Sequence, residues 1–131
     1  MSKQCNVRPS NGELAILRVL WDRGPSTVRQ VHEALDRGDV RYTTTLKIMQ
    51  NMTKKGLVTR DDSGGKHVYA PAVKEAPTKR RLLSDFADKA FGGSAGKLVL
   101  AALSAGDLSA GELREIRKLL RNKGTGDEHT R

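Results

Sequence analysis

The stretch that most constrains this chain is residues 42–57, which read YTTTLKIMQNMTKKGL. Four of its side chains recur at i, i+3, i+4 and i+7, a spacing that predicts an amphipathic helix with one face on a core. These four are Thr45, Ile48, Met49 and Met52. We expect Thr43 or Thr44 to cap the start of the helix, and Lys54-Lys55-Gly56 is a helix-stop signal.

The opposite face of this predicted helix carries Thr43, Thr44, Lys47, Gln50 and Asn51. None of these side chains is a carboxylate, and all can hydrogen-bond to base edges or phosphates. A DNA-recognition helix presents such a face to a major groove. The alternative is an ordinary solvated helix face, so the flanking segments decide between the two.

Two capping boxes precede this helix, Ser10-Asn11-Gly12-Glu13 and Thr27-Val28-Arg29-Gln30, and each predicts a helix start. Trp21 lies on the first of the two helices, where we expect a core role rather than a ligand platform. Residues 40–42 are too short for more than a one-residue bridge or a stub of strand. The short connection sets the second and third helices side by side at a steep angle, as in a helix-turn-helix.

A hairpin is predicted directly after the recognition helix. Residues 57–60 and 67–70 favour β-structure, and a polar, glycine-rich turn separates them. A hairpin in this place forms the wing of a winged helix, with residues 61–67 at its tip and Lys66 and His67 within reach of DNA. The alternative is a hairpin that only seals the core, and Val58 and Tyr69 can seal while Lys66 projects.

The rest of the chain predicts a separate helical part. Residues 71–77 are expected to form a hinge, with helices starting at Thr78, Ser94 and the capping box at Ser109. We therefore predict a DNA-binding domain over residues 1–75, a helical domain over residues 76–123 and a disordered tail over residues 124–131.

The three C-terminal helices carry more large apolar side chains than so small a unit can enclose. A two-fold dimer would close the same surfaces of two chains on each other. The alternative is packing back onto residues 1–75. The predicted dimer interface consists of Leu82, Leu83, Phe86, Phe91, Leu98, Val99, Leu103, Leu113, Ile116 and Leu120.

Charge points to a polyanionic partner. The chain has 24 lysine and arginine residues against 15 aspartate and glutamate residues, a net charge of +9. Such an excess is typical of proteins that bind nucleic acid or an anionic membrane surface. It is spread over both halves of the chain, so the placement of individual residues has to identify the contact surface.

Other function classes lack support in the sequence. No apolar run approaches the ~20 residues that span a membrane, and the N-terminus lacks the apolar core of a signal peptide, so we expect a cytoplasmic protein. Cys5 is the single cysteine, and the three histidines have no ligand spacing. Catalytic and phosphate-binding motifs are also missing. We expect no metal, no cofactor and no enzyme activity.

In the order and spacing of its motifs, the chain resembles the penicillinase-repressor (BlaI/MecI) family over about residues 9–121. The matching stretches are ELAILRVLW from Glu13, VRQVHEAL from Val28, YTTT from Tyr42, KKGLV from Lys54, VYAP from Val68, Gly93-Ser94 and LSAGEL from Leu108. The resemblance implies an N-terminal winged-helix domain, a C-terminal helical dimerisation domain and a bacterial repressor that binds a palindromic operator.

The resemblance also maps the family's recognition positions onto Thr43, Thr44, Lys47 and Asn51, the last of which is often basic in the family. For a winged-helix repressor we expect Arg41, Lys54, Lys55, Lys66 and His67 to hold phosphates or to enter the minor groove at the wing. Family members that answer β-lactams are cut at an Asn-Phe bond, and Ala101-Ala102 stand there in this chain. The cysteine cluster of copper-responsive relatives is missing too, so any sensor or antirepressor partner is unidentified.

The predicted protein is thus mainly α with a small β-hairpin wing, and it joins a winged helix-turn-helix domain to three dimerisation helices. Its expected partners are double-stranded operator DNA and a second copy of itself, with no membrane partner. The alternative function is a winged-helix module that recruits another protein, has no sequence-specific DNA binding and uses its charge only for solubility. Such a module would be expected to expose aromatic or large apolar anchors on its recognition face.

Overall fold

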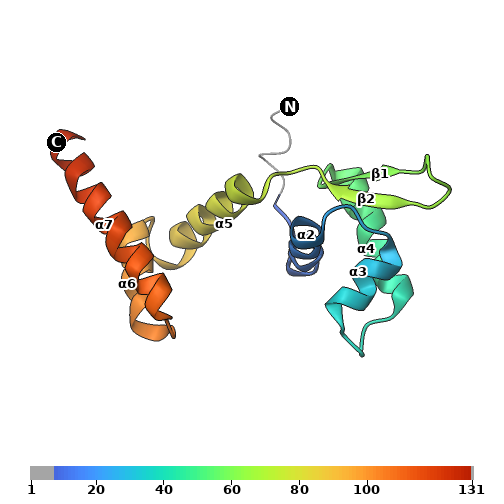
Figure 1. Ribbon diagram of the computed structural model, residues 1–131, viewed down its shortest axis with the longest axis horizontal. Coiled ribbons are helices and arrows are strands. Elements are labelled where there is room, and N and C mark those ends of the chain that lie inside the picture. The colour runs from blue at the N-terminus through green and yellow to red at the C-terminus, as the bar shows by residue number, and fades with distance from the viewer. Residues whose placement is uncertain (1–7, 131) are drawn as a thin grey trace. The chain divides into compact units, whose positions relative to one another are not determined.

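The computed structural model describes residues 8–130, with side chains up to residue 123, so Cys5 lies outside the described residues. The chain divides into two compact units, one ending at Asp85 and the other starting at Phe86. The first contains α2 (Asn11–Arg23), α3 (Val28–Leu35), α4 (Tyr42–Lys55) and the strands β1 (Val58–Asp61) and β2 (Val68–Pro71) (Figure 1). This mainly helical order with a terminal hairpin confirms the predicted winged-helix class.

Both predicted capping boxes of the first unit are formed. Glu13 N donates to Ser10 Oγ over 3.2 Å, and Ser10 N donates to Glu13 Oε1 over 2.9 Å. Thr27 and Gln30 make the same reciprocal pair over 3.2 and 2.9 Å. Each box satisfies backbone donors that the first turn of a helix leaves unpaired, which fixes where α2 and α3 begin.

The core of this unit lies where the three helices and the hairpin meet. The helices contact one another in all pairs, β1 contacts α4 and β2 contacts α2. Trp21 is half-buried beside this core, and its Nε1 donates to the carbonyl of Val73 over 3.0 Å. The buried apolar side chains are Ile16, Leu17, Leu20, Val28, Val31, Met49, Met52, Leu57, Val58, Tyr69 and Val73.

The hairpin pairs β1 and β2 antiparallel, with Val58 opposite Pro71 and Asp61 opposite Val68. A one-residue bridge adds to β2 from the segment between α2 and α3: Ser26 and Tyr69 exchange both backbone hydrogen bonds, over 2.9 and 2.8 Å. At residues 40–42 the sequence allows at most a one-residue bridge or a stub of strand, and the structure forms neither there. Ser26 is extended just before the Thr27 cap and so can pair in the ladder.

Two predicted helix starts are also wrong. The N-cap of α4 is Arg41, which makes no side-chain capping bond, so neither Thr43 nor Thr44 caps the helix. The next helix, α5 (Glu75–Ala90), begins before Thr78 and takes in Pro77. Proline is tolerated in a first turn because the N–H that it lacks would have no intrahelical partner there. The predicted hinge is correspondingly shorter.

The second unit contains the end of α5, then α6 (Ala95–Ala105) and α7 (Ala110–Thr130). Phe91 N and Gly93 N both donate to the carbonyl of Ala87, over 2.8 and 2.9 Å, and this closes α5. The predicted box at Ser109 is formed with Glu112 over 3.0 Å in both directions. The division into units falls inside α5, after the predicted boundary at residues 75 and 76, which stays a prediction.

Helix α7 continues to Thr130, past the residue 124 at which the sequence predicts the tail to begin. Glycines at 124 and 126 weaken a helix by about 1 kcal/mol each but keep their N–H groups for the helical hydrogen bonds.

Among the described residues, no helix combines the length and apolar character needed to cross a membrane. No group of three His, Cys, Asp or Glu side chains in that same part is arranged to hold a metal ion.

Candidate nucleic-acid interface

The exposed face of α4 is the centre of the candidate interface. Thr45, Met49 and Met52 are almost fully buried and fix the opposite face of the helix on the core. Gly56, with φ of 85°, ends the helix as predicted, and its N–H donates to the last carbonyls. The five predicted base-reading side chains, Thr43, Thr44, Lys47, Gln50 and Asn51, are all exposed.

Helix α3 holds the start of α4 through a polar and aromatic contact. His32 Nδ1 lies 2.8 Å from the hydroxyl of the buried Thr45. The ring of His32 also meets Tyr42 edge-on at 5.8 Å, and the Arg29 guanidinium lies 5.9 Å above the Tyr42 ring. These contacts set the direction in which the exposed face points. No local pattern in the sequence predicts them, since they join residues of different helices.

A hollow of about 410 Å³ opens on the exposed face of α4. Four of its lining residues, Thr43, Thr44, Lys47 and Asn51, are the recognition positions that the sequence predicts. The fifth, Ile48, belongs to the predicted core stripe, yet it is only half-buried and reaches the surface here. The sequence therefore predicts four of the five residues that line the hollow.

Lys54 and Lys55 are neighbours with different surroundings. Lys55 Nζ donates to both carboxylate oxygens of Glu13, over 3.0 and 2.8 Å, and so joins the end of α4 to the start of α2. Lys54 is exposed and has no ion pair within the described part of the chain. Both lysines were predicted to bind DNA, but the contact with Glu13 already engages Lys55.

Glu13 is a buried charge with several donors around it. Its side chain is 6% exposed. Burial alone raises the pKa of this carboxyl group, but hydrogen bonds from Lys55 and Ser10, together with the Lys55 charge, outweigh it and lower the pKa below its ordinary value. Glu13 therefore stays ionised at neutral pH, and the charged pair with Lys55 persists.

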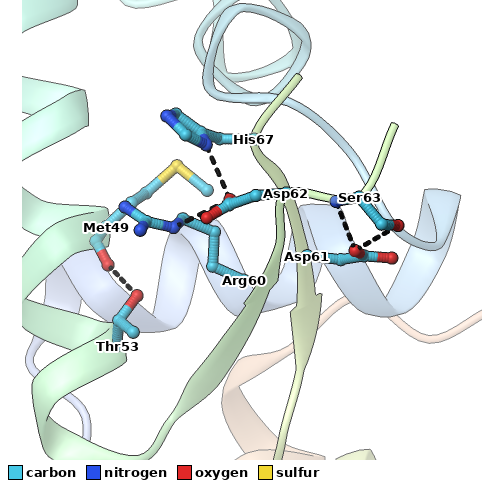
Figure 2. Close-up of polar contacts among 7 residues, drawn as sticks. All are labelled: Met49, Thr53, Arg60, Asp61, Asp62, Ser63 and His67. Atoms are coloured by element: carbon cyan, nitrogen blue, oxygen red, sulfur yellow. Dashed lines mark hydrogen bonds and ion pairs between the residues drawn. The ribbon is translucent and has the colours of Figure 1, made fainter. Parts of the chain in front are cut away.

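The wing carries carboxylates as well as cations, as Figure 2 shows. Asp62 Oδ1 accepts from Arg60 Nε over 3.0 Å and lies 2.6 Å from His67 Nδ1. The Tyr69 hydroxyl, and then the Asp62 carboxylate, raise the pKa of the Arg60 guanidinium. His67, a predicted DNA contact, is thus held by a carboxylate, whereas Lys66 is exposed without an ion pair among the described residues.

A second carboxylate shapes the turn at the wing tip. Asp61 Oδ1 accepts from Ser63 N over 2.9 Å and from Ser63 Oγ over 2.7 Å (Figure 2). These bonds lower the pKa of Asp61. In α4, Thr53 Oγ1 donates to the carbonyl of Met49 over 3.0 Å, and so the threonine hydroxyl is directed at its own helix (Figure 2). The sequence shows both aspartates but not which groups they bind.

A second hollow in the first unit is lined by polar residues. It measures about 620 Å³ and lies among α2, the end of α3 and the start of α5. Its charged lining residues are Arg18, Asp22, Arg23, Arg37, Glu75 and Lys79. Lys79 pairs with Glu75 over 2.6 Å across one turn of α5. None of these residues belongs to the predicted DNA-binding set.

The predicted dimer residues all keep some exposure to solvent in the described chain. None of the ten is buried in the described chain, and Leu83 and Phe86 are each 54% exposed. Phe86 and Phe91 meet edge-on at 5.9 Å within the second unit. Two further apolar side chains, Leu100 and Leu119, are 66% and 58% exposed and were not predicted. Exposure of this kind is not visible in a sequence pattern.

Comparison with known proteins gives consistent matches. The sequence profile described as penicillinase repressor matches residues 9–122. Transcriptional regulator BlaI of Mycobacterium tuberculosis (strain ATCC 25618 / H37Rv) is 48% identical over 61 residues, which make up 45% of this chain and 44% of that protein. This match therefore spans less than half the length of the mycobacterial relative.

Two further relatives match over most of their length. Methicillin resistance regulatory protein MecI of Staphylococcus aureus is 24% identical over 115 residues, covering 87% of this chain and 94% of MecI. Penicillinase repressor of Bacillus licheniformis is 24% identical over 112 residues, covering 85% of this chain and 88% of that protein. All three relatives carry the names of regulators or repressors.

Proposed function

Because the chain belongs to the penicillinase repressor family, as its sequence motifs predict, we propose that it is a DNA-binding transcriptional repressor. The observation that carries this proposal is the exposed face of α4, which bears a lysine, an amide pair and threonines but no carboxylate. The buried stripe beneath it holds this face outward. A helix of this kind fits the major groove, where side-chain amides and lysine read base edges.

Two sets of residues have different tasks in this proposal. Thr43, Thr44, Lys47, Gln50 and Asn51 read bases. The exposed cations Arg41, Lys54 and Lys66 hold phosphates and supply most of the affinity without sequence information. Lys55 and His67 act indirectly, because each is bound to a carboxylate of its own chain. A repressor that reads chromosomal DNA would work in the bacterial cytoplasm.

We further propose that two copies associate through the second unit and bind a palindromic operator. The exposed leucines of α5, α6 and α7 and the exposed Phe86 support this, since contact with a second copy would remove their apolar surface from water. Dimerisation would set the distance between half-sites at about one helical turn of DNA, ~34 Å, or a multiple of it.

Two lysine variants test the division between base readers and phosphate contacts. Lys47→Ala should change base preference at one step of the half-site, and Lys66→Ala should weaken binding to all sequences and lower its salt dependence. The measurement is a titration of several duplexes at two salt concentrations. Equal losses with unchanged salt slopes would contradict the division. An absence of salt-linked DNA affinity would favour a protein-recruiting module instead.

A further inference from the structure

The hollow on α4 contains one apolar wall within an otherwise polar face. Ile48 is half-buried: part of it packs against the core cluster, and part lines the hollow beside the threonines. Its Cδ1 atom lies 3.8 Å from the place where a Cβ on Gly12 would stand, so the apolar wall lies beside the start of α2.

The chemistry of the hollow selects among the features of a base-pair edge. The exposed lining is mainly apolar, although Lys47 and Asn51 are among the residues that line it. A base donor or acceptor placed against Ile48 would lose its hydrogen bonds to water without replacement. In the major groove of unmodified DNA, the apolar group on offer is the C5-methyl of thymine.

We infer that this hollow binds the C5-methyl group of a thymine in each operator half-site, and that Ile48 is a specificity-determining residue. The inference rests on the proposed function, since it concerns the same reading face. Ile48 and the two threonines enclose the methyl group. Lys47 and Asn51 then meet the hydrogen-bonding atoms of the neighbouring bases. Loss of one buried methyl group should weaken binding about fourfold.

The test uses the full chain and duplexes that carry uracil. The best-binding duplex is first selected from a randomised pool. Each thymine is then replaced in turn by deoxyuridine, which removes only the C5-methyl group. One position in each half-site should show the fourfold loss, while the other thymines show little change.

A variant pair then assigns the effect to the hollow. Ile48→Ala should abolish the penalty at the sensitive position, because the apolar wall is gone. Thr53→Ala, an exposed position of α4 outside both the hollow and the proposed DNA contacts, should keep the penalty in full. Ile48→Val retains an apolar wall, and it should keep most of the penalty even if the alanine variant fails to fold.

The outcomes separate the two proposals. If the parent protein binds the selected duplex but tolerates uracil at every position, this inference is overturned and the proposed function stands. The same holds if a folded Ile48→Ala variant keeps the penalty in full. A chain that binds no duplex overturns the proposed function and this inference with it.

Discussion

At the scale of single residues, two adjacent lysines of α4 have different roles. Lys55 neutralises a carboxylate that is almost fully removed from water, and Lys54 faces solvent. A buried charge that loses its partner is strongly destabilising, whereas an exposed lysine contributes little to folding. The pair therefore offers a matched comparison between a structural cation and a proposed DNA-binding one.

Lys55→Ala should lower the free energy of unfolding by about 1–3 kcal/mol, because it leaves the Glu13 carboxylate without its charged donor. Lys54→Ala should leave stability within about 0.5 kcal/mol and weaken DNA binding instead. Urea denaturation and duplex titration of both variants check this. Equal stability of the two variants would show that the Glu13 contact contributes nothing to folding.

The same ion pair predicts a dependence of stability on pH. Because the pKa of Glu13 is lowered on folding, its contribution is present above the ordinary glutamate pKa and is lost as pH falls through the folded value. Glu13→Gln keeps a capping-box side chain but removes the charge. The parent should therefore be more stable than the variant at neutral pH, and the difference should shrink in acid.

Thermal unfolding of both proteins across the acid range measures this difference. Glu33→Gln on α3 is the matched control, because Glu33 is exposed and its loss should change melting temperature equally little at all pH values. A gap between parent and Glu13→Gln that stays constant down to pH values below the ordinary glutamate pKa would exclude the linkage.

At the scale of elements, the wing is electrostatically mixed. Arg60 and Lys66 carry positive charge, but Asp62 binds Arg60 and His67, and Asp61 forms the turn. A carboxylate near a phosphate backbone opposes DNA binding because the two negative charges repel. It also pairs with cations that could otherwise bind phosphates. If the hairpin contacts phosphates as proposed, it should therefore bind them more weakly than its count of basic residues indicates.

Asp62→Asn should tighten DNA binding about two- to fivefold, the range of an exposed charge interaction, and steepen its salt dependence. The amide keeps an acceptor oxygen for Arg60, so the turn should retain its shape. Asp107→Asn, an equal charge change between α6 and α7, is the control and should have a smaller effect. Weaker binding by Asp62→Asn would mean that the carboxylate orders the wing for contact.

At the scale of the whole molecule, the second unit leaves large apolar side chains uncovered. Leu100 is 66% exposed on α6, and Leu119 and Leu120 are each 58% exposed on α7. Apolar groups placed this way gain free energy when another surface removes them from water. A symmetric pair doubles the effect of every substitution, because each chain contributes the same side chain.

Leu100→Ser in the full chain should weaken self-association by about tenfold or more, since two leucines lose their burial. Ala101→Ser, one residue away and also exposed, should leave association close to that of the parent. Sedimentation equilibrium over a range of protein concentrations measures both. Helix content by circular dichroism should not change. If the Leu100 variant associates like the parent, the covered surface lies elsewhere.

The sequence by itself determined where most elements begin and end, because those signals are local. A capping box joins residues three positions apart, a glycine with positive φ closes the helix that precedes it, and β-favouring runs around a polar turn form a hairpin. The polar face of α4 followed from helical spacing alone. Even the wrong start of α5 had a local origin, in the expectation that Pro77 would precede the helix.

Only the tertiary structure decided which side chains on these elements are free. Lys55 meets Glu13 from 42 positions along the chain, Thr45 meets His32 across two helices, and Ile48 reaches the surface beside Gly12. Local patterns carry no information about such contacts. The contacts depend on how the helices pack and on which side chains this packing removes from water. The tertiary structure therefore separates the cations held within the fold from those left for DNA.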